Sequence, residues 1–531
     1  MERFDYVVVG AGPAGCVLAR RLSAEPATTV LLIEAGDHDT NPLIAMPRGY
    51  AELLGDPEIA WHYPIRPFDP AGQREVWVRG RTLGGSSSVN GLVYNRGGRA
   101  DYDELEALGN AGWGWDDLLP AFIAIEDHDL GATATRGAGG PLHVSAAVGD
   151  PLLEDVIAAG ESLGWRRSED YNETDDERIG YAMATIRDGR RHSAADAFLH
   201  PVEDRSNLTV SVRTTVDRVV LDGGAAVGVQ GRRDGRPFEA AGREVILAAG
   251  AISTPAILQR SGIGPVETLR SAGVEVVVDS PNVGGRLREH RVAMLQFRLV
   301  EDVGYNRLLE PEEGRAAAMR EWLTSGGGPL GAPSFNVVGF FRTRHGLDRP
   351  DAQIQIAPFS LRPYRPGEAL QVEREPGMAC VAFALRPESE GSVSITSADP
   401  DAVLDIDPGY LTTEHDRRTT VDLVRGVRRL FAQAPLAARI KGETMPGPES
   451  RSDREILDAA LTYGSAGYHA IATCAMGPAD DDVVDSRLRV RGVRGLRVVD
   501  ASVLPVMVSG NLNGPVSALA WRAADLILEG N

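Results

Sequence analysis

His469 is the residue in this chain whose type and surroundings most directly suggest acid–base chemistry. It stands in GSAGYHAIATCAMG, flanked by glycines, alanines and hydroxylic residues, and it is one of only ten histidines. A neutral imidazole titrates near physiological pH, so it can accept a proton from a substrate. The same surroundings also suit a histidine that only hydrogen-bonds to backbone. Because no carboxylate or second histidine lies within a helical turn of it, the local sequence predicts neither a metal site nor a charge pair.

A glycine-rich stretch near the N-terminus has the spacing that binds a pyrophosphate. In FDYVVVGAGPAGCVLARRL, Gly10, Gly12 and Gly15 form GxGxxG between a short β-branched strand and an apolar helix. The glycines let backbone N–H groups approach a phosphate at the helix N-terminus. The next strand ends in Glu34, where a carboxylate accepts hydrogen bonds from a ribose and disfavours a 2′-phosphate. The stretch therefore predicts an unphosphorylated adenine dinucleotide, NAD or FAD.

Two further stretches add information about the ligand and the fold. Residues 76–103 contain the run GGSSS, a flexible loop of small donors that can lie against a flat ring or a phosphate. This loop favours FAD over NAD. Residues 250–265, GAISTPAILQRSGIGP, follow a strand over 244–248. Ser253, Thr254 and Pro255 are expected to cap and start a helix there.

Length, composition and charge exclude several classes of protein. A chain of 531 residues is expected to form two or more domains. A net charge of −20 argues against nucleic-acid binding. The three cysteines are scattered, which predicts neither a disulfide framework nor a zinc site. The first strand begins at Tyr6, leaving no room for a signal peptide, and no apolar stretch approaches bilayer length. The expectation is a soluble cytoplasmic protein without a metal or a membrane partner.

Together these stretches resemble the glucose–methanol–choline (GMC) oxidoreductases, a family of FAD-dependent alcohol oxidases and dehydrogenases. GRTLGGSSSVNGLVYNRGGRADYD is similar to one family signature and GAISTPAILQRSGIG to the other. The stretches DSPNVGGRLREH (279–290), PGYL (408–411) and VRGVRGLRVVDASVLP (490–505) are similar as well. The resemblance thus covers essentially the whole chain in the right order.

The resemblance implies an α/β fold, α+β overall, with a Rossmann-like FAD-binding domain assembled from discontinuous segments. We place these segments at residues 1–155, 205–295 and 460–531. Residues 156–204 and 296–459 are then expected to form a substrate-binding domain, an antiparallel sheet backed by helices. Residues 300–330 combine charges, an amphipathic helix and glycines, which suits either a lid or a passive surface excursion.

The resemblance also implies which residues hold the cofactor. The residues expected to hold the ADP half of FAD are Gly10, Gly12, Gly15 and Glu34. Those expected to lie against the pyrophosphate and the flavin are Gly84, Gly85, Ser86 and Asn90. The backbone of Val216 is expected to contact the adenine, and Asp500 and Ala501 the phosphates and the ribityl chain. Some relatives attach the flavin to a histidine at the position of Val89. Valine cannot form that bond, so FAD is expected to be noncovalent.

By the same resemblance, YHAIATCAMG aligns with the family motif HxxGTxxMG and makes His469 the active-site histidine. Ala472 replaces the usual glycine. A second active-site residue, histidine or asparagine, comes from the C-terminal segment. GNLNGP offers two asparagines there, and the spacing from Asp500 favours Asn513. Neutral His469, with a pKa near the working pH, would take the hydroxyl proton as hydride moves to the flavin, while Asn513 donates to the substrate oxygen.

The expected reaction is the oxidation of a primary alcohol, aryl alcohols included, to an aldehyde. Small residues around His469, notably Gly467, suggest room for O2 and favour it as the electron acceptor. Two alternatives stay open: a dehydrogenase with a non-oxygen acceptor, and a hydroxynitrile lyase, which keeps FAD and the histidine but cleaves a cyanohydrin. A photodecarboxylase is discounted because its cysteine corresponds to Leu385. Candidates for an aromatic wall of the substrate pocket, or for core packing, are Trp61, Tyr63, Tyr94 and Phe359.

Overall fold

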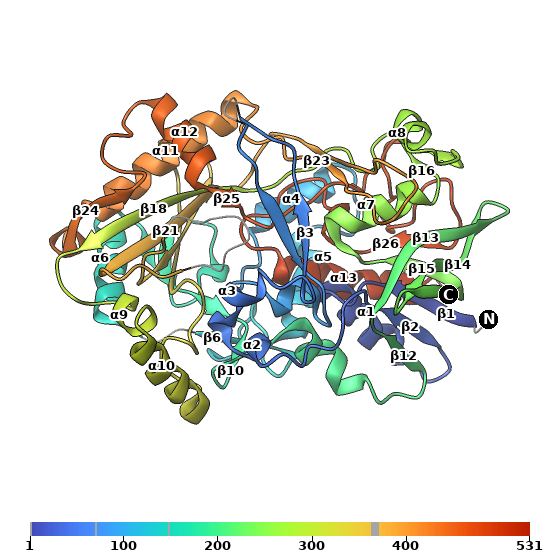
Figure 1. The fold of residues 1–531 in the computed structure, drawn as a ribbon, viewed down its shortest axis with the longest axis horizontal. Coiled ribbons are helices and arrows are strands. Elements are labelled where there is room, and N and C mark those ends of the chain that lie inside the picture. The colour runs from blue at the N-terminus through green and yellow to red at the C-terminus, as the bar shows by residue number, and fades with distance from the viewer. Residues whose placement is uncertain (1–2, 70–71, 147–148, 363–370, 531) are drawn as a thin grey trace.

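Two large β-sheets form the framework of the computed structural model, which describes residues 3–69, 72–146, 149–362 and 371–530 (Figure 1). The first sheet lies at the end of the molecule that carries both termini, and the second at the opposite end. Residues from the middle and the C-terminal part of the chain contribute to both sheets.

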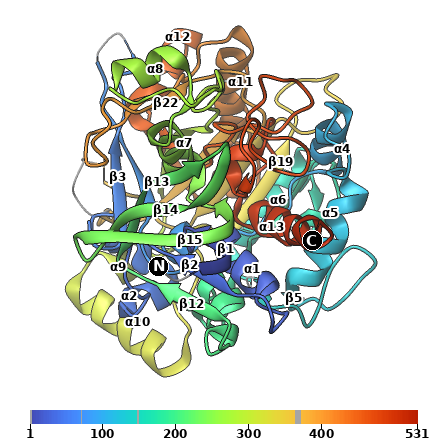
Figure 2. The same ribbon diagram turned by 90° about the vertical axis from the view of Figure 1, so that its right-hand side faces the viewer.

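The first sheet has the strand order β12–β2–β1–β15–β14–β13, with β26 paired to β15. Its strands are β1 (Arg3–Val9), β2 (Val30–Ile33), β12 (Leu208–Ser211), β13 (Thr214–Asp222), β14 (Ala225–Arg233), β15 (Arg236–Leu247) and β26 (Leu496–Val498). The pairs around β1 and β2 are parallel, as is β15 with β26, whereas β13, β14 and β15 form an antiparallel meander. Helices α1 (Pro13–Leu22), α5 (Trp115–Ile125) and α13 (Asn513–Leu528) lie to one side of this sheet (Figure 2).

The second sheet has the order β24–β18–β21–β20–β19–β8–β7, with β25 paired to β18. Its strands are β7 (Arg166–Arg167), β8 (Arg178–Tyr181), β18 (Arg291–Leu299), β19 (Val337–Phe341), β20 (Ala352–Ala357), β21 (Gly377–Ala384), β24 (Ile440–Met445) and β25 (Ser465–Ala466). All pairs except β7–β8 are antiparallel. Side chains of one face share an apolar cluster with α6 (Pro151–Ser162) and α11 (Glu414–Phe431). The other face turns toward the first sheet.

The expected fold class is confirmed: an α/β structure, α+β overall, combines a Rossmann-like part with an antiparallel sheet backed by helices. The strands of the Rossmann-like sheet come from residues 3–9, 30–33, 208–247 and 496–498, so this part is assembled from discontinuous segments. Strand β18 runs across the expected boundary at 295–296 and joins the two parts. The residue boundaries of the domains stay a prediction.

Shorter elements connect these layers. They are α2 (Pro42–Ala45), α3 (Tyr50–Leu53), β3 (Ala60–Pro64), β4 (Val76–Gly80), α4 (Arg99–Ala107), β5 (Glu126–His128), β6 (Leu142–Ala146), β9 (Met183–Ala184), β10 (Ile186–Arg187), β11 (Arg190–Arg191), α7 (Gly250–Arg260), β16 (Ile263–Gly264), α8 (Val266–Ser271), β17 (Val278–Asp279), α9 (Asn306–Leu309), α10 (Glu312–Ser325), β22 (Ser392–Ser394), β23 (Asp405–Asp407) and α12 (Asp453–Tyr463). Among the helices of the described residues, none is both long and apolar enough to cross a membrane.

Helix α7 begins three residues before the start predicted from Ser253, so Pro255 lies inside it. A proline has no N–H to donate to the carbonyl four residues earlier. Here that carbonyl, on Ala251, instead accepts from Thr473 Oγ1 at 2.7 Å. The helix start is held by Asp500, whose Oδ2 accepts from the Gly250 N–H at 2.8 Å. The predicted start was wrong because two tertiary partners stabilise an earlier one: Asp500 accepts from the first N–H of the helix, and Thr473 donates to the carbonyl that Pro255 leaves free.

Residues 300–330 form α9 and α10 along the outside of the molecule, at the lower left of Figure 1. Trp322 of α10 fastens this segment to the body, since its Nε1 donates to the Gly189 carbonyl at 2.8 Å. Tyr305, just before α9, lies with its ring against the buried Arg48 guanidinium. The segment therefore covers the end of β20, where Leu309 packs against Ala357 and Phe359.

Candidate active site

His469 is placed by the pairing of β25 with the start of β18. Ala466 lies opposite Arg291 in this pair, and the Gly467 N–H donates to the His290 carbonyl at 2.7 Å. This pairing brings residues 467–469 alongside residues 288–290. Two buried histidines that are 179 positions apart in the sequence therefore become neighbours: His290 is fully buried and His469 is 8% exposed.

The hydrogen bonds of the two histidines determine which ring nitrogen of His469 is free to act as a base. His290 Nε2 is 3.0 Å from the Leu385 carbonyl, which can only accept, so this nitrogen carries the proton. In a neutral ring His290 Nδ1 is then an acceptor. It lies 2.9 Å from His469 Nδ1, which must donate. The lone pair of His469 is thereby left on Nε2.

Burial keeps both rings neutral. It lowers the pKa of His469 well below its usual value, with smaller contributions from His290 and Arg79. It also lowers the pKa of His290 to about 4. The sequence predicted a His469 pKa near the working pH, whereas burial of the ring lowers it. His469 is therefore unprotonated throughout the physiological range and ready to accept a proton.

Asn511 faces the free nitrogen of His469. Its Nδ2 lies 3.2 Å from His469 Nε2 and donates to it. Its Oδ1 accepts from three buried amides, those of Asn95 at 2.7 Å, Gln355 at 2.7 Å and Gln353 at 3.2 Å. These donors fix the Asn511 carboxamide with its NH2 group toward His469. The site thus presents one acceptor, Nε2, and one donor, Nδ2, side by side.

The pairing expected between His469 and Asn513 is not the one that the structure shows. Asn513 is the first residue of α13, and its buried Oδ1 has no hydrogen-bond partner among the described residues. Asn511 lies two residues earlier, before the helix begins. The spacing from Asp500 did not reveal which of the two asparagines precedes the helix. The geometry assigns the contact with His469 to Asn511.

Glu289 anchors the backbone of both histidines. Its Oε1 accepts from the His469 N–H at 2.6 Å and from the His290 N–H at 2.9 Å, while Oε2 lies 3.3 Å from the Arg79 guanidinium. Burial raises the pKa of Glu289 to about 7. When ionised, this carboxylate offsets the positive charge that His469 acquires on accepting a proton.

Gly467 lies against both His290 and His469. A Cβ at this position would lie 2.9 Å from His290 Cβ and 3.0 Å from His469 Nδ1. The missing side chain therefore makes room for the two imidazoles. The argument that Gly467 leaves room for O2 was wrong, because the space is on the Nδ1 side and is already filled.

The glycines of the N-terminal fingerprint have two different roles. Gly10 and Gly15 permit close packing, because a Cβ would lie 2.6 Å from the Ala248 carbonyl oxygen in the first case and 1.8 Å from that of Gly10 in the second. A Cβ on Gly12, by contrast, meets no atom within 4 Å. Gly85 packs on Gly12, since its own Cβ would lie 2.7 Å from the Gly12 Cα. The GGSSS loop and the N-terminus of α1 therefore form one cradle, open at Gly12, which fits a pyrophosphate.

Glu34 lies at the carboxyl end of β2, beside this cradle. Its Oε2 accepts from the Ala11 N–H at 2.9 Å and its Oε1 from the Gly36 N–H at 2.8 Å. Burial raises the pKa of Glu34, and these backbone donors oppose the rise. The carboxylate thus holds the glycine loop in shape. Each of its oxygens keeps a second lone pair that suits a ribose hydroxyl.

The remaining cofactor candidates orient loops around the same region. Asp500 is buried and accepts from the Gly250 N–H, Thr254 Oγ1 and the Ser502 N–H, which ties α7 to the turn that begins at Ala501. Ser86 Oγ accepts from the Gly80 N–H, and Asn90 Oδ1 accepts from the Leu92 N–H and from Arg191. Val216 is buried in β13, and Gly84, with φ +83°, directly precedes the 3-10 turn Gly85–Ser88. Their contacts with FAD stay a prediction.

Sequence reasoning missed the residues that set the polarity of the site. These are His290, Glu289, Leu385 and the three amides of Asn95, Gln353 and Gln355. His290 ends the stretch 279–290 that resembles the family, and a histidine at that place could have been taken as a candidate site residue. Gln353 and Gln355 gave a weaker indication, because they alternate with apolar residues in the strand AQIQIA.

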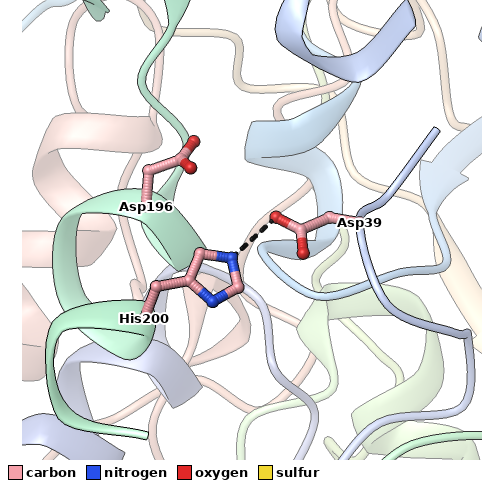
Figure 3. A group of neighbouring side chains, drawn as sticks. All are labelled: Asp39, Asp196 and His200. Carbon is pink, nitrogen blue, oxygen red and sulfur yellow. Dashed lines mark hydrogen bonds and ion pairs between the residues drawn. The ribbon is translucent and has the colours of Figure 1, made fainter. Parts of the chain in front are cut away.

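One cluster elsewhere has the composition of a metal site (Figure 3). His200 Nε2 lies 3.0 Å from Asp39 and its Nδ1 lies 2.9 Å from Glu203, while Asp196 accepts from the Ser193 N–H and Oγ. The hydrogen bond to Asp39, opposed by burial and helped by Glu203, raises the pKa of His200 to about 9. A protonated imidazole has no lone pair for a metal. With His200 protonated, the cluster is an ion-pair network of one imidazolium and its neighbouring carboxylates.

Comparisons with known proteins agree with this geometry. The family models of the GMC oxidoreductases match residues 4–292 and 387–520. Mitochondrial choline dehydrogenase of Mus musculus is 38% identical over 99% of this chain and 89% of its own length. Oxygen-dependent choline dehydrogenase of Brucella anthropi is 37% identical over 99% of this chain and 95% of its own.

Solved structures show the same fold along the whole chain. Pyridoxine 4-oxidase from Mesorbium loti superposes with a TM-score of 0.89 at 32% identity, covering 99% of each chain. A formate oxidase superposes with a TM-score of 0.91 at 27% identity, covering 100% of this chain and 99% of its own. The resemblance found in the sequence is thus confirmed. The chain belongs to the GMC oxidoreductases, FAD-binding enzymes that act on CH–OH donors.

Proposed function

We propose that this protein oxidises a primary alcohol to an aldehyde, with His469 as the base and Asn511 as the donor that orients the hydroxyl. The observation that carries the proposal is the fixed polarity of the pair: a lone pair on His469 Nε2 beside an N–H of Asn511. An alcohol oxygen fits between them, since its O–H can donate to Nε2 while its lone pair accepts from Nδ2. Bound FAD supplies the hydride acceptor.

Side chains of the protein accept the hydroxyl proton and stabilise the charge that its removal leaves. His469 Nε2 takes it from the hydroxyl, which makes the alcohol carbon a better hydride donor. Asn511 stabilises the negative charge that develops on the oxygen, because it is held as a donor by the three amides behind it. The His469 imidazolium keeps its Nδ1–H hydrogen bond to His290, and the Glu289 carboxylate accepts from the backbone N–H of His469.

A panel of primary alcohols tests the proposal. Aliphatic, aryl and amino alcohols, choline included because of the relatives, are mixed with the FAD-loaded protein without oxygen, and bleaching of the flavin absorbance is recorded. Bleaching together with one aldehyde per flavin supports alcohol oxidation. If no alcohol in the panel bleaches the flavin, the proposal fails.

We also propose O2 as the electron acceptor. Support comes from the solved structures named pyridoxine 4-oxidase and formate oxidase and from the oxygen-dependent relative. Hydrogen peroxide formed in step with aldehyde is the expected result. Reduced flavin that survives air for minutes would instead favour the alternative, a dehydrogenase with another acceptor.

A hydroxynitrile lyase is the second candidate, since the same acceptor and donor can move the hydroxyl proton of a cyanohydrin without redox chemistry. The anaerobic experiment separates the two. A lyase releases cyanide while the flavin stays oxidised, whereas an alcohol oxidase bleaches it.

FAD is expected to be released when the protein is denatured, because Val89 offers no atom for a covalent bond to the flavin. The proposed FAD site uses Gly10, Gly12, Gly15, Glu34, Gly84, Gly85, Ser86, Asn90, Val216, Asp500 and Ala501. Purified protein is precipitated with acid, and the supernatant is assayed for free FAD. All the yellow colour should be in the supernatant. Colour retained by the washed precipitate would contradict the noncovalent prediction.

Asn511→Ala is expected to slow flavin reduction by roughly tenfold, the usual worth of one hydrogen bond of 1–2 kcal/mol to a developing charge. Asn513→Ala is the matched comparison, since it removes the same side chain two residues away, with no contact to His469. Both variants are measured by anaerobic stopped-flow at saturating alcohol. A larger loss in Asn513→Ala than in Asn511→Ala would restore the assignment made from the sequence.

A further inference from the structure

Arg48 is a buried guanidinium that the proposed chemistry does not use. It lies in the 3-10 turn Pro47–Gly49 and is 8% exposed. Its Nε and Nη2 donate to the Pro333 carbonyl at 3.1 and 2.9 Å, and Nη2 also donates to Asn336 Oδ1 at 2.9 Å. Its Nη1 has no hydrogen-bond partner among the described residues. Within the same part of the chain, no carboxylate forms an ion pair with it.

An unpaired buried charge is costly, so its retention points to a partner that binds from outside the chain. The rings of Tyr305 and Phe359 lie 4.9 Å from the guanidinium and recover part of the cost. Burial lowers the pKa of Arg48 only to about 10, so it remains charged at neutral pH. Neither ring can accept the remaining N–H in the way an oxyanion can.

The strand register places Arg48 near the catalytic pair. Its partner Asn336 directly precedes β19, and Val338, two residues on, is paired with Gln355 of β20. Gln355 contacts Asn511. Side chains two residues apart along a strand share a face, so Asn336 and Gln355 are diagonal neighbours about 7–8 Å apart. Asn511 and the Arg48 guanidinium are thus each hydrogen-bonded to one of two diagonal neighbours on the same face of the second sheet.

A second set of contacts joins Arg48 to the loop expected to hold the flavin. Arg191 is buried without an ion pair in the described residues, and it donates to the Pro47 carbonyl at 3.2 Å and to Asn90 Oδ1 at 2.8 Å. Ser334, beside the Pro333 carbonyl, has a buried Oγ that lacks a partner. A Cβ on Gly91 would lie 3.1 Å from this Oγ. The free hydroxyl of Ser334 thus adjoins Gly91, and the turn that carries Arg48 is linked through Arg191 to Asn90.

We propose that Arg48 and Ser334 form a subsite for a carboxylate on the substrate, so that the alcohol oxidised by this protein is a hydroxy acid. The proposal rests on the proposed function, because it names the class of alcohol for the same site. The carboxylate accepts from Arg48 Nη1 and Ser334 Oγ while the hydroxyl lies between His469 and Asn511. Tyr305, in the covering segment 300–330, closes over the guanidinium. A quaternary ammonium substrate would bring a second positive charge to this surface.

The native holoenzyme is tested with three benzyl alcohols that differ only in the para group: 4-(hydroxymethyl)benzoate, 4-methylbenzyl alcohol and the 4-(trimethylammoniomethyl) analogue. Flavin reduction is followed by anaerobic stopped-flow. The carboxylate compound is expected to have a kcat/KM about 10–100-fold above that of the methyl compound, the usual worth of hydrogen bonds to a charged group. The cationic compound is expected to be the poorest. ω-Hydroxy acids of increasing length, against the matching alkanols, extend the comparison.

Arg48→Met removes the charge and keeps an unbranched apolar side chain. It is expected to abolish the preference for the carboxylate while changing kcat/KM for the methyl compound by less than about threefold. Arg48→Lys should retain part of the preference, because it keeps the charge. Arg178→Met is the matched control, since Arg178 is also buried and lies over an aromatic ring, 4.0 Å from Phe340, but its donors have carbonyl partners. This control should lower stability without changing the preference.

The unreactive 4-methylbenzoate gives a readout that does not need turnover. Its binding, measured from the shift of the flavin spectrum, should weaken about 10–100-fold in Arg48→Met. Equal rates with the carboxylate and methyl compounds in the native enzyme would overturn the proposal, as would an equal loss with both in Arg48→Met. If the methyl compound reduces the flavin without any carboxylate preference, only this inference fails. If no alcohol reduces the flavin, the proposed function fails, and the binding of 4-methylbenzoate still decides whether the subsite exists.

Discussion

Replacing His469 by alanine is expected to slow reduction of the bound flavin by alcohol roughly 10²–10⁴-fold, the usual worth of a positioned general base. FAD should stay bound, because the side chain of His469 contacts His290 and Asn511 and none of the glycine cradle. The loss should fall on the rate constant for reduction more than on substrate affinity, since the proton moves only as the transition state is approached. Anaerobic stopped-flow at several alcohol concentrations separates the two quantities.

The pH profile of the native enzyme should identify the same group. His469 accepts a proton only when it is neutral, so the reduction rate should fall as the pH drops below its pKa. Burial holds that pKa well below the usual 6.5, which places the falling limb on the acid side of neutrality. The limb should be absent in His469→Ala. A pH-independent native profile across this range would contradict the assignment of the base.

His128→Ala is the matched control for the histidine. His128 is buried, and burial lowers its pKa to about 4, but it lies beside Asp170 at a distance from the catalytic pair. This variant should reduce its flavin at the native rate. A His469→Ala enzyme that did the same would return His469 to a structural histidine.

The choice of His469 as the proposed base could be made from the sequence, whereas its protonation pattern could not. YHAIATCAMG carries enough of a family motif to select His469. The nitrogen that bears its proton depends on the Leu385 carbonyl, which acts through His290. Both are far from His469 in the sequence, and only the packing of β18 against β25 and β21 brings them together. Local patterns carry no information on such contacts.

The sequence favoured Asn513, and which asparagine hydrogen-bonds to His469 could not be read from it for a related reason. Asparagine is favoured near helix N-termini, and NLNGP offers one at two positions, so propensity could not locate the first residue of α13. The helix begins at Asn513, after Leu512, without a side-chain cap. Three amides from the loop at Asn95 and from β20 then select Asn511. By contrast, the β1–loop–α1 unit was predictable because the whole GxGxxG pattern, with the strand before it and the helix after it, lies within about 20 consecutive residues.

Gly12→Val is expected to abolish FAD binding almost completely while leaving the fold intact. Gly12 has an ordinary φ of −75°, and a Cβ there meets no atom of the chain within 4 Å. The chain itself therefore offers no obstacle to a Cβ at this position. Its side chain occupies the space through which a pyrophosphate must reach the backbone N–H groups at the start of α1. A loss of FAD in a folded variant would therefore come from blocked phosphate binding and not from unfolding.

The ratio of flavin to protein absorbance in the purified variant measures this loss, and the circular dichroism spectrum reports the fold. Gly442→Val is the matched control, because Gly442 also has no atom within 4 Å of a Cβ, but it lies in β24 of the second sheet. That variant should carry full FAD. If Gly12→Val also carried full FAD, the fingerprint would not be the pyrophosphate site. If both variants lost it, the effect would come from valine replacing glycine anywhere in the chain, and the specific argument for Gly12 would fail.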